Sequence, residues 1–531
     1  MILLPIVLLL LSCSGLTNEC TAQKTEEALI LIDEQTLTSQ LQMTVWVEIG
    51  DDKDDFHTPG TITIPQCEDR YFSLSGLTPE NVDSYVDELN KLGITRIGLL
   101  DSGRSETVTH EDIIAYRNAG LFSNLTSLDL VGCDILTDLS ALSGLAGLTS
   151  IRLYSCESIS DISALASLPN LTSLELRSCD NLNMSNLSAL SNLTKLNALK
   201  LVGCESLIDI SAMSNLTKLT TFSADGCSQL SDISALSDLT NLTTLQLKWC
   251  VGLEDISALS DFTNLTTLDL SWNPRLIDIS PLSNLETLIS VDLSLCENLS
   301  DISPLSGLKN LDSINLSLCR YLSDISDLSS LTNLAELRLS SCMNVSDISP
   351  LAELSNLTSL SLPPTITNED LQALSDEGVL RNLAELNLIN CKELEDISPL
   401  SGLTSLAKLD LSDCEGLSAA SLMGSLLNLT ESDSLGDLSP LLSLTGLTEL
   451  TLPPGITNRT LRSLRAQGVL TNLTYLSLRD CDQLSNVSAL YGLPNLTKLS
   501  FVYCEKIREM GYDDFQELKK RFPNCEVLRV G

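Results

Sequence analysis

The chain has 531 residues, of which 43% are hydrophobic but only 4% are aromatic, so its core must be built from aliphatic side chains. Seventy acidic residues oppose 31 basic residues, which gives a formal net charge of −39. A surface of this charge repels nucleic-acid phosphates and anionic lipids, so the composition argues against nucleic-acid binding and against electrostatic attachment to a membrane.

The N-terminus begins with an apolar run, Ile2–Leu11. Its length is typical of the core of a signal peptide and is far below the ~20 residues of a spanning helix. The segment Leu10–Cys13 resembles the bacterial lipoprotein box, although no Lys or Arg precedes the run. We therefore expect residues 1–13 to be a signal peptide or lipoprotein leader with Cys13 as the lipidation site. A leader that is simply cleaved, or a misassigned start codon, remains an alternative.

Residues 14–78 do not repeat, and we expect them to form an N-terminal cap. Within it, Thr44–Ile49 and Thr61–Ile64 predict strands, and Cys20 with Cys67 is the expected disulfide. Pro79–Leu92 predicts a helix that Thr78 and Pro79 open. At the other end, residues 512–531 predict a C-terminal cap with a last helix, Tyr512–Arg521, and a short strand, Glu526–Val530.

Residues 79–511 repeat, and most neighbouring cysteines within them are 23 residues apart. Cys133, Cys156 and Cys179 are 23 residues apart, and Asn273 takes the place of a cysteine in a later copy. The segment Leu265–Asn273 reads L-x-x-L-x-L-x-x-N, by which the chain is identified as a member of the leucine-rich-repeat proteins. Thirteen cysteines occupy this position, here called the ladder position: Cys133, Cys156, Cys179, Cys204, Cys227, Cys250, Cys296, Cys319, Cys342, Cys391, Cys414, Cys481 and Cys504.

Within a repeat, Leu268 and Leu270 alternate with polar residues, as in a strand with one buried face. So short a strand needs a parallel copy on each side. The sequence therefore predicts an α/β solenoid, a right-handed coil of about 17 leucine-rich repeats with a concave parallel sheet and a convex side of short turns. Three longer repeats predict convex helices at 108–120, 366–378 and 456–468. A step of 41 residues between Cys414 and Gly455 predicts a bulge or kink near 428–435.

An aspartate follows many ladder positions by five residues. Stacking would place these carboxylates about 5 Å apart, where a divalent cation could bridge them. The favoured interpretation is that each aspartate caps a tight turn by accepting a backbone N–H. The column consists of Asp138, Asp161, Asp209, Asp232, Asp255, Asp278, Asp301, Asp324, Asp347 and Asp396.

Catalytic motifs are scarce. His57 and His110 are the only histidines, and the sequence has no nucleophile elbow, phosphate-binding loop or dinucleotide fingerprint. We expect no catalytic residue, no metal and no cofactor. Triplets such as those at Asn170, Asn241 and Asn495 match the glycosylation pattern, but the repeat consensus itself demands them.

The outward positions of each strand lie six, four, two and one residues before the ladder position. They are mostly small or acidic, with two groups of aromatic and basic exceptions that we expect to bind a ligand. That ligand is a protein with an acidic surface, or a glycan that stacks on the rings; alternatively, the two tryptophans only cover the edge of the sheet. The expected binding residues are Arg152, Tyr154, Arg177, Lys200, Lys248, Trp249, Trp272, Tyr475, Arg479, Lys498 and Tyr503.

The repeats that begin at Asp301 and Asp396 resemble those of the internalins, bacterial surface proteins, which implies protein recognition on the concave sheet. The 23-residue step is longer than that typical of internalins, and the ladder cysteines are similar to those of intracellular adaptor proteins. We expect a non-catalytic binding or scaffolding protein of the cell envelope, lipid-anchored or secreted. The alternative is a cytoplasmic adaptor, which the thirteen thiols favour. The sequence leaves the oligomeric state open.

Overall fold

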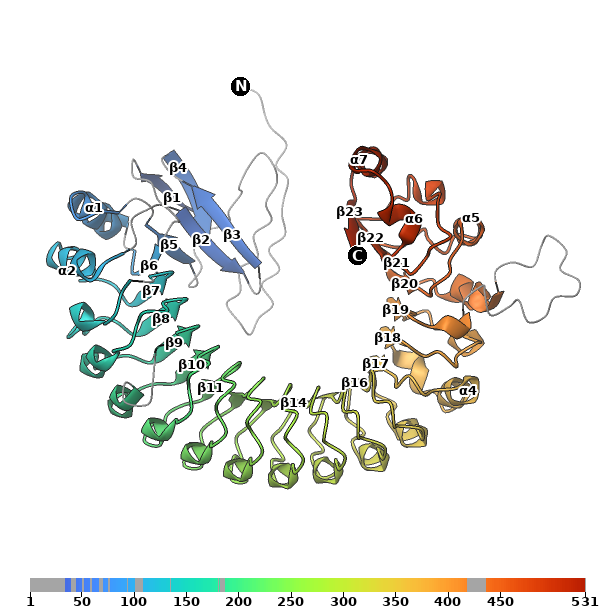
Figure 1. Ribbon diagram of the computed structural model, residues 1–531, viewed down its shortest axis with the longest axis horizontal. Helices are drawn as coiled ribbons and strands as arrows, with labels where there is room; N and C mark the ends of the chain where they lie inside the picture. Colours follow the sequence, from blue (N-terminus) through green and yellow to red (C-terminus); the bar gives the residue numbers. More distant parts are fainter. Residues whose placement is uncertain are drawn as a thin grey trace, which may run out of the picture. The chain divides into compact units, whose positions relative to one another are not determined.

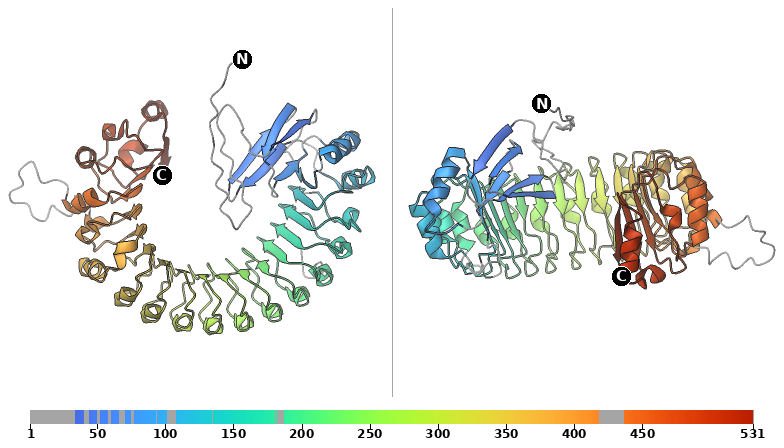
Figure 2. Two further views of the ribbon diagram at one scale, coloured as in Figure 1. Left: turned by 180° about the vertical axis from the view of Figure 1, so that it is seen from behind. Right: turned by 90° about the horizontal axis from the view of Figure 1, so that it is seen from above.

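The computed structural model describes residues 34–39, 44–49, 52–57, 60–65, 70–74, 77–92, 94–100, 108–133, 135–179, 181, 187–417 and 436–530. The predicted leader with Cys13 and the predicted disulfide between Cys20 and Cys67 lie outside these residues. The chain forms two compact units, Met1–Leu242 and Thr243–Gly531. Within each unit the strands line one side and 3₁₀ turns line the other (Figure 1, Figure 2).

The first unit begins with strands that are mostly antiparallel. β2 pairs with β3 and with β5, β1 pairs with β4, and β5 pairs in parallel with β6. The elements before the repeats are β1 (Glu34–Ser39), β2 (Thr44–Ile49), β3 (Asp52–His57), β4 (Gly60–Pro65), β5 (Arg70–Ser73) and α1 (Val82–Leu92). The two predicted strands are therefore confirmed as β2 and β4, and the first repeat strand extends a sheet that the preceding strands begin.

Helix α1 begins three residues later than the sequence predicts. The Thr78 N–H donates to Asn81 Oδ1 at 2.8 Å, and the Asn81 N–H donates to the Thr78 carbonyl at 3.2 Å. These two bonds close a turn ahead of Val82, so the predicted start at Pro79 is wrong. Pro79 lies in this turn, which leads into the helix.

The repeat strands of the first unit form a parallel ladder in register. Leu128, Ile151, Leu174 and Leu199 are paired in turn and fully buried. The strands and the helix between them are β6 (Arg96–Leu100), α2 (His110–Asn118), β7 (Ser127–Val131), β8 (Ser150–Tyr154), β9 (Ser173–Arg177), β10 (Ala198–Val202) and β11 (Thr221–Ser223).

The second unit continues the same pattern. Leu245, Leu268, Val291 and Ile314 form one buried row across neighbouring parallel strands. Its elements are β12 (Thr244–Gln246), β13 (Thr267–Asp269), β14 (Ser290–Asp292), β15 (Ser313–Asn315), β16 (Glu336–Arg338), β17 (Ser359–Ser361), α4 (Asn368–Asp376), β18 (Glu385–Asn387), β19 (Lys408–Asp410), β20 (Glu449–Leu452), α5 (Asn458–Ala466), β21 (Tyr475–Arg479), β22 (Lys498–Val502), α6 (Glu505–Arg508), α7 (Tyr512–Lys519) and β23 (Glu526–Val530). The α/β solenoid expected from the repeats is confirmed.

The ladder cysteines connect one coil to the next. All thirteen are buried and lie outside any disulfide. The Cys227 thiol donates to the Leu201 carbonyl at 2.9 Å, and the Cys414 thiol donates to the Leu388 carbonyl at 3.0 Å. Asn273 does the same through Nδ2, which lies 2.9 Å from the Leu247 carbonyl. The small polar side chain at this position therefore satisfies a carbonyl of the preceding coil.

The aspartate column caps the turns. In all ten repeats Oδ1 accepts the backbone N–H of the serine two residues later, at 2.6 to 2.9 Å. Asn486 holds the same turn through its amide oxygen at 2.8 Å, so the cap does not need a charge. The capping interpretation is confirmed, and no group of residues suited to a metal ion occurs in the part of the chain that the structure describes.

The three predicted convex helices are confirmed as α2, α4 and α5. Thr109 and Thr367 each close a full capping box, with Asp112 and Asp370 respectively. Thr457 accepts the N–H of Thr460 at the start of α5. The predicted last helix and strand are confirmed as α7 and β23.

Two further sequence features are the asparagine triplets and the predicted bulge. The amides of Asn170, Asn241 and Asn495 donate to carbonyls of the preceding coil at 2.8 to 3.1 Å, so these triplets serve the fold. The predicted bulge near 428–435 lies outside the described residues. On either side of it, β19 and β20 pair directly, with Leu409 opposite Leu450, and the ladder continues in register.

Candidate binding face of the sheet

Each unit presents one face of its sheet outward. Along β13, Leu268 is buried while its neighbours Thr267 and Asp269 are partly exposed. Period-two alternation places the residues six, four and two positions before the ladder residue on this face, here called the sheet face. The predicted binding residues belong to it or to its edge.

In the first unit, the predicted cations surround an acid. Glu175 on β9 is paired in register with Arg152 on β8 and with Lys200 on β10. Arg177 Nη2 lies 3.0 Å from Glu175 Oε1, and its guanidinium lies 5.5 Å from the Tyr154 ring centroid. Burial, followed by the charge of Glu175, raises the pKa of Tyr154 above its ordinary value. The structure therefore brings these four predicted residues together around a buried carboxylate that the prediction omitted.

In the second unit, Trp249 and Trp272 form a stacked pair at the edge of the sheet face. Their ring centroids are 5.4 Å apart, with an angle of 26° between the planes. The two residues remain 52% and 41% exposed, and exposed Lys248 precedes them. The pair covers part of its own surface but leaves a large aromatic area in solvent.

The position just before the ladder residue has a left-handed backbone. Trp249 has φ +58° and Trp272 has φ +62°, and Leu295 and Leu318 in the next two coils have φ +59° and +64°. An L-residue in this conformation costs roughly 1–2 kcal/mol, and bulky side chains are rare there. Other coils place Gly, Ser, Asn or Asp at this position, and the coil that ends at Cys504 places Tyr503 there with φ +51°. The fold therefore has no need of an apolar side chain in these four coils.

The C-terminal group of predicted residues lies on β21 and β22. Lys498 Nζ lies 5.8 Å from the Tyr475 ring centroid, and the Arg479 guanidinium lies 5.5 Å from that of Tyr503. Arg479 Nε also lies 3.4 Å from Asp413 Oδ1. These cation–π pairs stack the predicted residues two by two on neighbouring strands.

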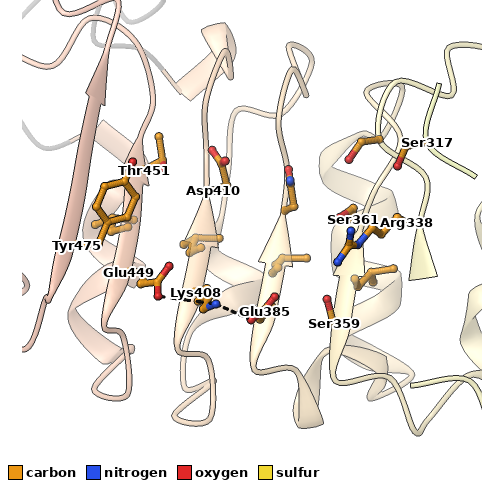
Figure 3. Close-up of a pocket in the computed structure, with 16 residues that line it drawn as sticks. Ser317, Arg338, Ser359, Ser361, Glu385, Lys408, Asp410, Glu449, Thr451 and Tyr475 are labelled. Atoms are coloured by element: carbon orange, nitrogen blue, oxygen red, sulfur yellow. Dashed lines mark ion pairs between the residues drawn. The ribbon is translucent and has the colours of Figure 1, made fainter. Parts of the chain in front are cut away.

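A pocket of about 380 Å³ opens on the sheet face of the second unit. Its lining residues come from the coils of β15 to β21, with Leu360, Leu386, Leu409 and Leu450 among them (Figure 3). Lys408 Nζ lies 2.9 Å from Glu385 Oε1 and 3.7 Å from Glu449 Oε1. Both carboxylates raise the pKa of Lys408, and Glu385 has the larger effect.

Most residues of this pocket were not predicted from the sequence. Glu385, Lys408, Glu449 and Tyr475 occupy the same position, six residues before the ladder position, in successive coils. Of these four residues, only Tyr475 is among the predicted binding residues. Reading that one column across coils shows an alternation of acid and base next to an aromatic residue, and this signal is visible in the sequence.

Other candidate chemistry is sparse. His110 begins α2 and its Nδ1 lies 3.5 Å from Asp138 Oδ1, while His57 belongs to β3. Among the residues that the structure describes, none of the helices has the length and apolar character of a membrane span.

Comparisons with known proteins agree with the repeat architecture. Residues 149–271 match the BspA type leucine-rich-repeat region in six copies. The crystal structure of an internalin (inlF) from Listeria monocytogenes is 29% identical, with a TM-score of 0.51, over 62% of this chain and 93% of that one. Internalin C2 of the same organism is 33% identical over 32% of this chain and 72% of its own, with a TM-score of 0.29.

A third similar structure is the functional domain of InlJ from Listeria monocytogenes, described as including a cysteine ladder. It is 20% identical, with a TM-score of 0.38, over 64% of this chain and 76% of that one. A comparison with curated proteins gave no significant match. On its repeats, its fold and its likeness to the inlF structure, the chain belongs to the leucine-rich-repeat proteins, with repeats of the internalin-like type and cysteines at the ladder positions.

Proposed function

We propose that this chain is a non-catalytic, exported protein that binds another protein on the sheet face. The observation that carries the proposal is the tryptophan pair. Trp249 and Trp272 are half exposed and sit in a backbone conformation that favours glycine. Neither burial nor backbone preference accounts for two tryptophans there, whereas binding does, since exposed Trp, Tyr and Arg dominate interface energies.

The proposed binding residues form three groups. Arg152, Tyr154, Arg177 and Lys200 surround Glu175 in the first unit, while Lys248 accompanies the tryptophans in the second. Tyr475, Arg479, Lys498 and Tyr503 form the third group. A glycan is the second ligand class that these rings could hold, because sugar rings stack on aromatic faces. The net charge of −39 opposes a nucleic acid as ligand.

For export, the supporting observation is the apolar start of the chain, with Cys13 as its proposed lipid attachment. We also propose that residues 14–78 and 512–531 cap a repeat region that spans residues 79–511. The cytoplasmic alternative drew on the thirteen thiols. Burial raises the pKa of Cys179, Cys296 and Cys342 to about 12, and it is the thiolate that oxidises. Buried thiols of this kind persist outside the cytoplasm as well, so they do not favour one compartment.

Site-specific photo-crosslinking in the producing cells tests the binding proposal. A photoreactive residue replaces Gln246, which lies on the sheet face beside the tryptophans. In the matched control the same residue replaces Ser283, which is exposed at the end of a 3₁₀ turn. We expect one discrete protein adduct from position 246 and none from position 283. Equal adduct patterns from both positions, or none from either, would contradict the proposal.

A further inference from the structure

The pocket on the sheet face of the second unit contains a cation held between two anions. Glu385, Lys408 and Glu449 stand in register on β18, β19 and β20. Figure 3 shows Lys408 reaching toward both carboxylates, and Tyr475 on β21 is paired in register with Glu449. Parallel strands ~4.8 Å apart hold the two carboxylates about two strand spacings from each other. A single cationic group therefore fits between them.

The ion pairs of Lys408 with Glu385 and Glu449 are weak. Its side chain is 48% exposed, and those of Glu385 and Glu449 are 44% and 40% exposed. Ion pairs with this much solvent access contribute only ~0–1 kcal/mol. An incoming cation can therefore displace the Lys408 ammonium into water at little cost, and the two carboxylates then regain a partner.

The rest of the pocket also favours a cation. Its lining contributes three carboxylates, with Asp410 as the third, against the two cations Arg338 and Lys408. Arg338 is ion-paired with Glu336 on its own strand. Tyr475 adds an aromatic ring that already holds the Lys498 ammonium at 5.8 Å. The anionic excess of the pocket has the sign of the whole chain.

We propose that this pocket binds an arginine or lysine side chain from an extended segment of the partner protein. Glu385 and Glu449 are its anionic ligands, Tyr475 is its aromatic wall, and Lys408 is the built-in cation that the partner displaces. The inference rests on the proposed function, since it names the chemistry of the partner on the same sheet face. It differs from the tryptophan surface in predicting a basic partner segment.

The test uses the full chain and a short fluorescent peptide of glycine and serine that carries arginines. Two companion peptides carry lysines or glutamates at the same places. Charge-matched variant pairs separate the pocket from the general field of an acidic protein. Glu385→Gln and Glu415→Gln each remove one carboxylate, and Lys408→Ala and Lys392→Ala each remove one ammonium. Lys392 and Glu415 form an exposed pair outside the pocket, with 2.6 Å between Nζ and Oε1.

We expect Glu385→Gln to weaken binding of the arginine peptide at least ~5-fold, and Glu415→Gln to change it less than ~2-fold. Lys408→Ala should tighten the same binding, whereas Lys392→Ala should not. The lysine peptide should follow the same order, and the glutamate peptide should not bind.

Equal effects within each matched pair would overturn the proposal, because they would show a non-specific response to net charge. Preference for the glutamate peptide would overturn it as well. Far-UV circular dichroism of every variant separates lost binding from lost folding. The crosslinks from position 246 report on the proposed function independently. If position 246 forms an adduct but the variants within each pair bind the arginine peptide alike, the proposed function stands and the basic partner segment is refuted. If the variants differ as expected but position 246 forms no adduct, the cation pocket stands and the proposed protein partner at the tryptophans is refuted.

Discussion

Replacing Trp249 by glycine and by alanine measures how much the left-handed position opposes its own side chain. Trp249 has φ +58°. Glycine relieves the roughly 1–2 kcal/mol that this conformation costs an L-residue, while alanine retains that cost. Both changes remove the ring contact with Trp272, which contributes about 0.5–1.5 kcal/mol. Glycine also loses roughly 0.5–1 kcal/mol through its freer unfolded chain.

We therefore expect Trp249→Gly to unfold within about 1 kcal/mol of the parent, and to be more stable than Trp249→Ala by about 0.5–1 kcal/mol. Urea unfolding of the full chain, followed by far-UV circular dichroism, measures the difference. Gln246 provides the control in the same coil. Because it lies within β12, Gln246→Gly should be less stable than Gln246→Ala. If alanine is the better replacement at both positions, the left-handed strain is not the constraint that we infer.

Further predictions concern the turns, the thiols and the leader. Asp278→Asn should keep the melting temperature, since Asn486 holds the equivalent turn, whereas Asp278→Ala should lower it; added Ca²⁺ should shift neither variant. Hydrogen bonds from the Ser280 backbone and side chain lower the pKa of Asp278. The ionised carboxylate therefore stabilises the fold above the ordinary pKa of ~4, and this stabilisation is lost as the pH falls below that value. The difference in melting temperature between the parent and Asp278→Ala should accordingly shrink at acid pH. Burial raises the pKa of Cys179, Cys296 and Cys342 above the unfolded value of ~8.5, so the melting temperature should fall as pH rises beyond that value, where only the unfolded chain loses these protons. In native protein a thiol reagent should label partly exposed Cys525 before any ladder cysteine, and peptide mapping that finds early label at Cys227 would refute this. Intact-mass analysis of membrane fractions should find a mature chain that begins at Cys13 with added acyl mass, and Cys13→Ala should abolish it; a soluble chain that retains Met1 would contradict export.

The repeat architecture could be predicted because the residues of each coil define how it aligns with its neighbours. Alternating leucines such as Leu268 and Leu270 define the buried face, and the ladder cysteines define the step between coils. Helices α2, α4 and α5 were predictable because a capping threonine and a terminal glycine bracket each of them. These signals are local, so one sequence is enough to read them.

What the sequence did not predict depends on contacts with neighbouring strands. β3 reads Asp-Lys-Asp-Asp-Phe-His, a composition that disfavours strands, and it forms by pairing with β2. Glu175 was passed over because its role appears only when β8 and β10 place Arg152 and Lys200 beside it. The left-handed column could have been found from Gly132, Gly203 and Gly226 at equivalent positions, but its consequence for Trp249 and Trp272 needs the backbone angles.

The central claim is that the sheet face binds a protein through side chains that the fold does not require. The most direct measurement is the affinity of the double variant Trp249→Gly/Trp272→Gly for the partner that position 246 crosslinks, made alongside the melting temperature of the same sample. We expect binding to weaken more than ~5-fold while the melting temperature stays close to that of the parent. Parental affinity with an intact fold would contradict the account, because the tryptophans would then contribute neither to folding nor to binding.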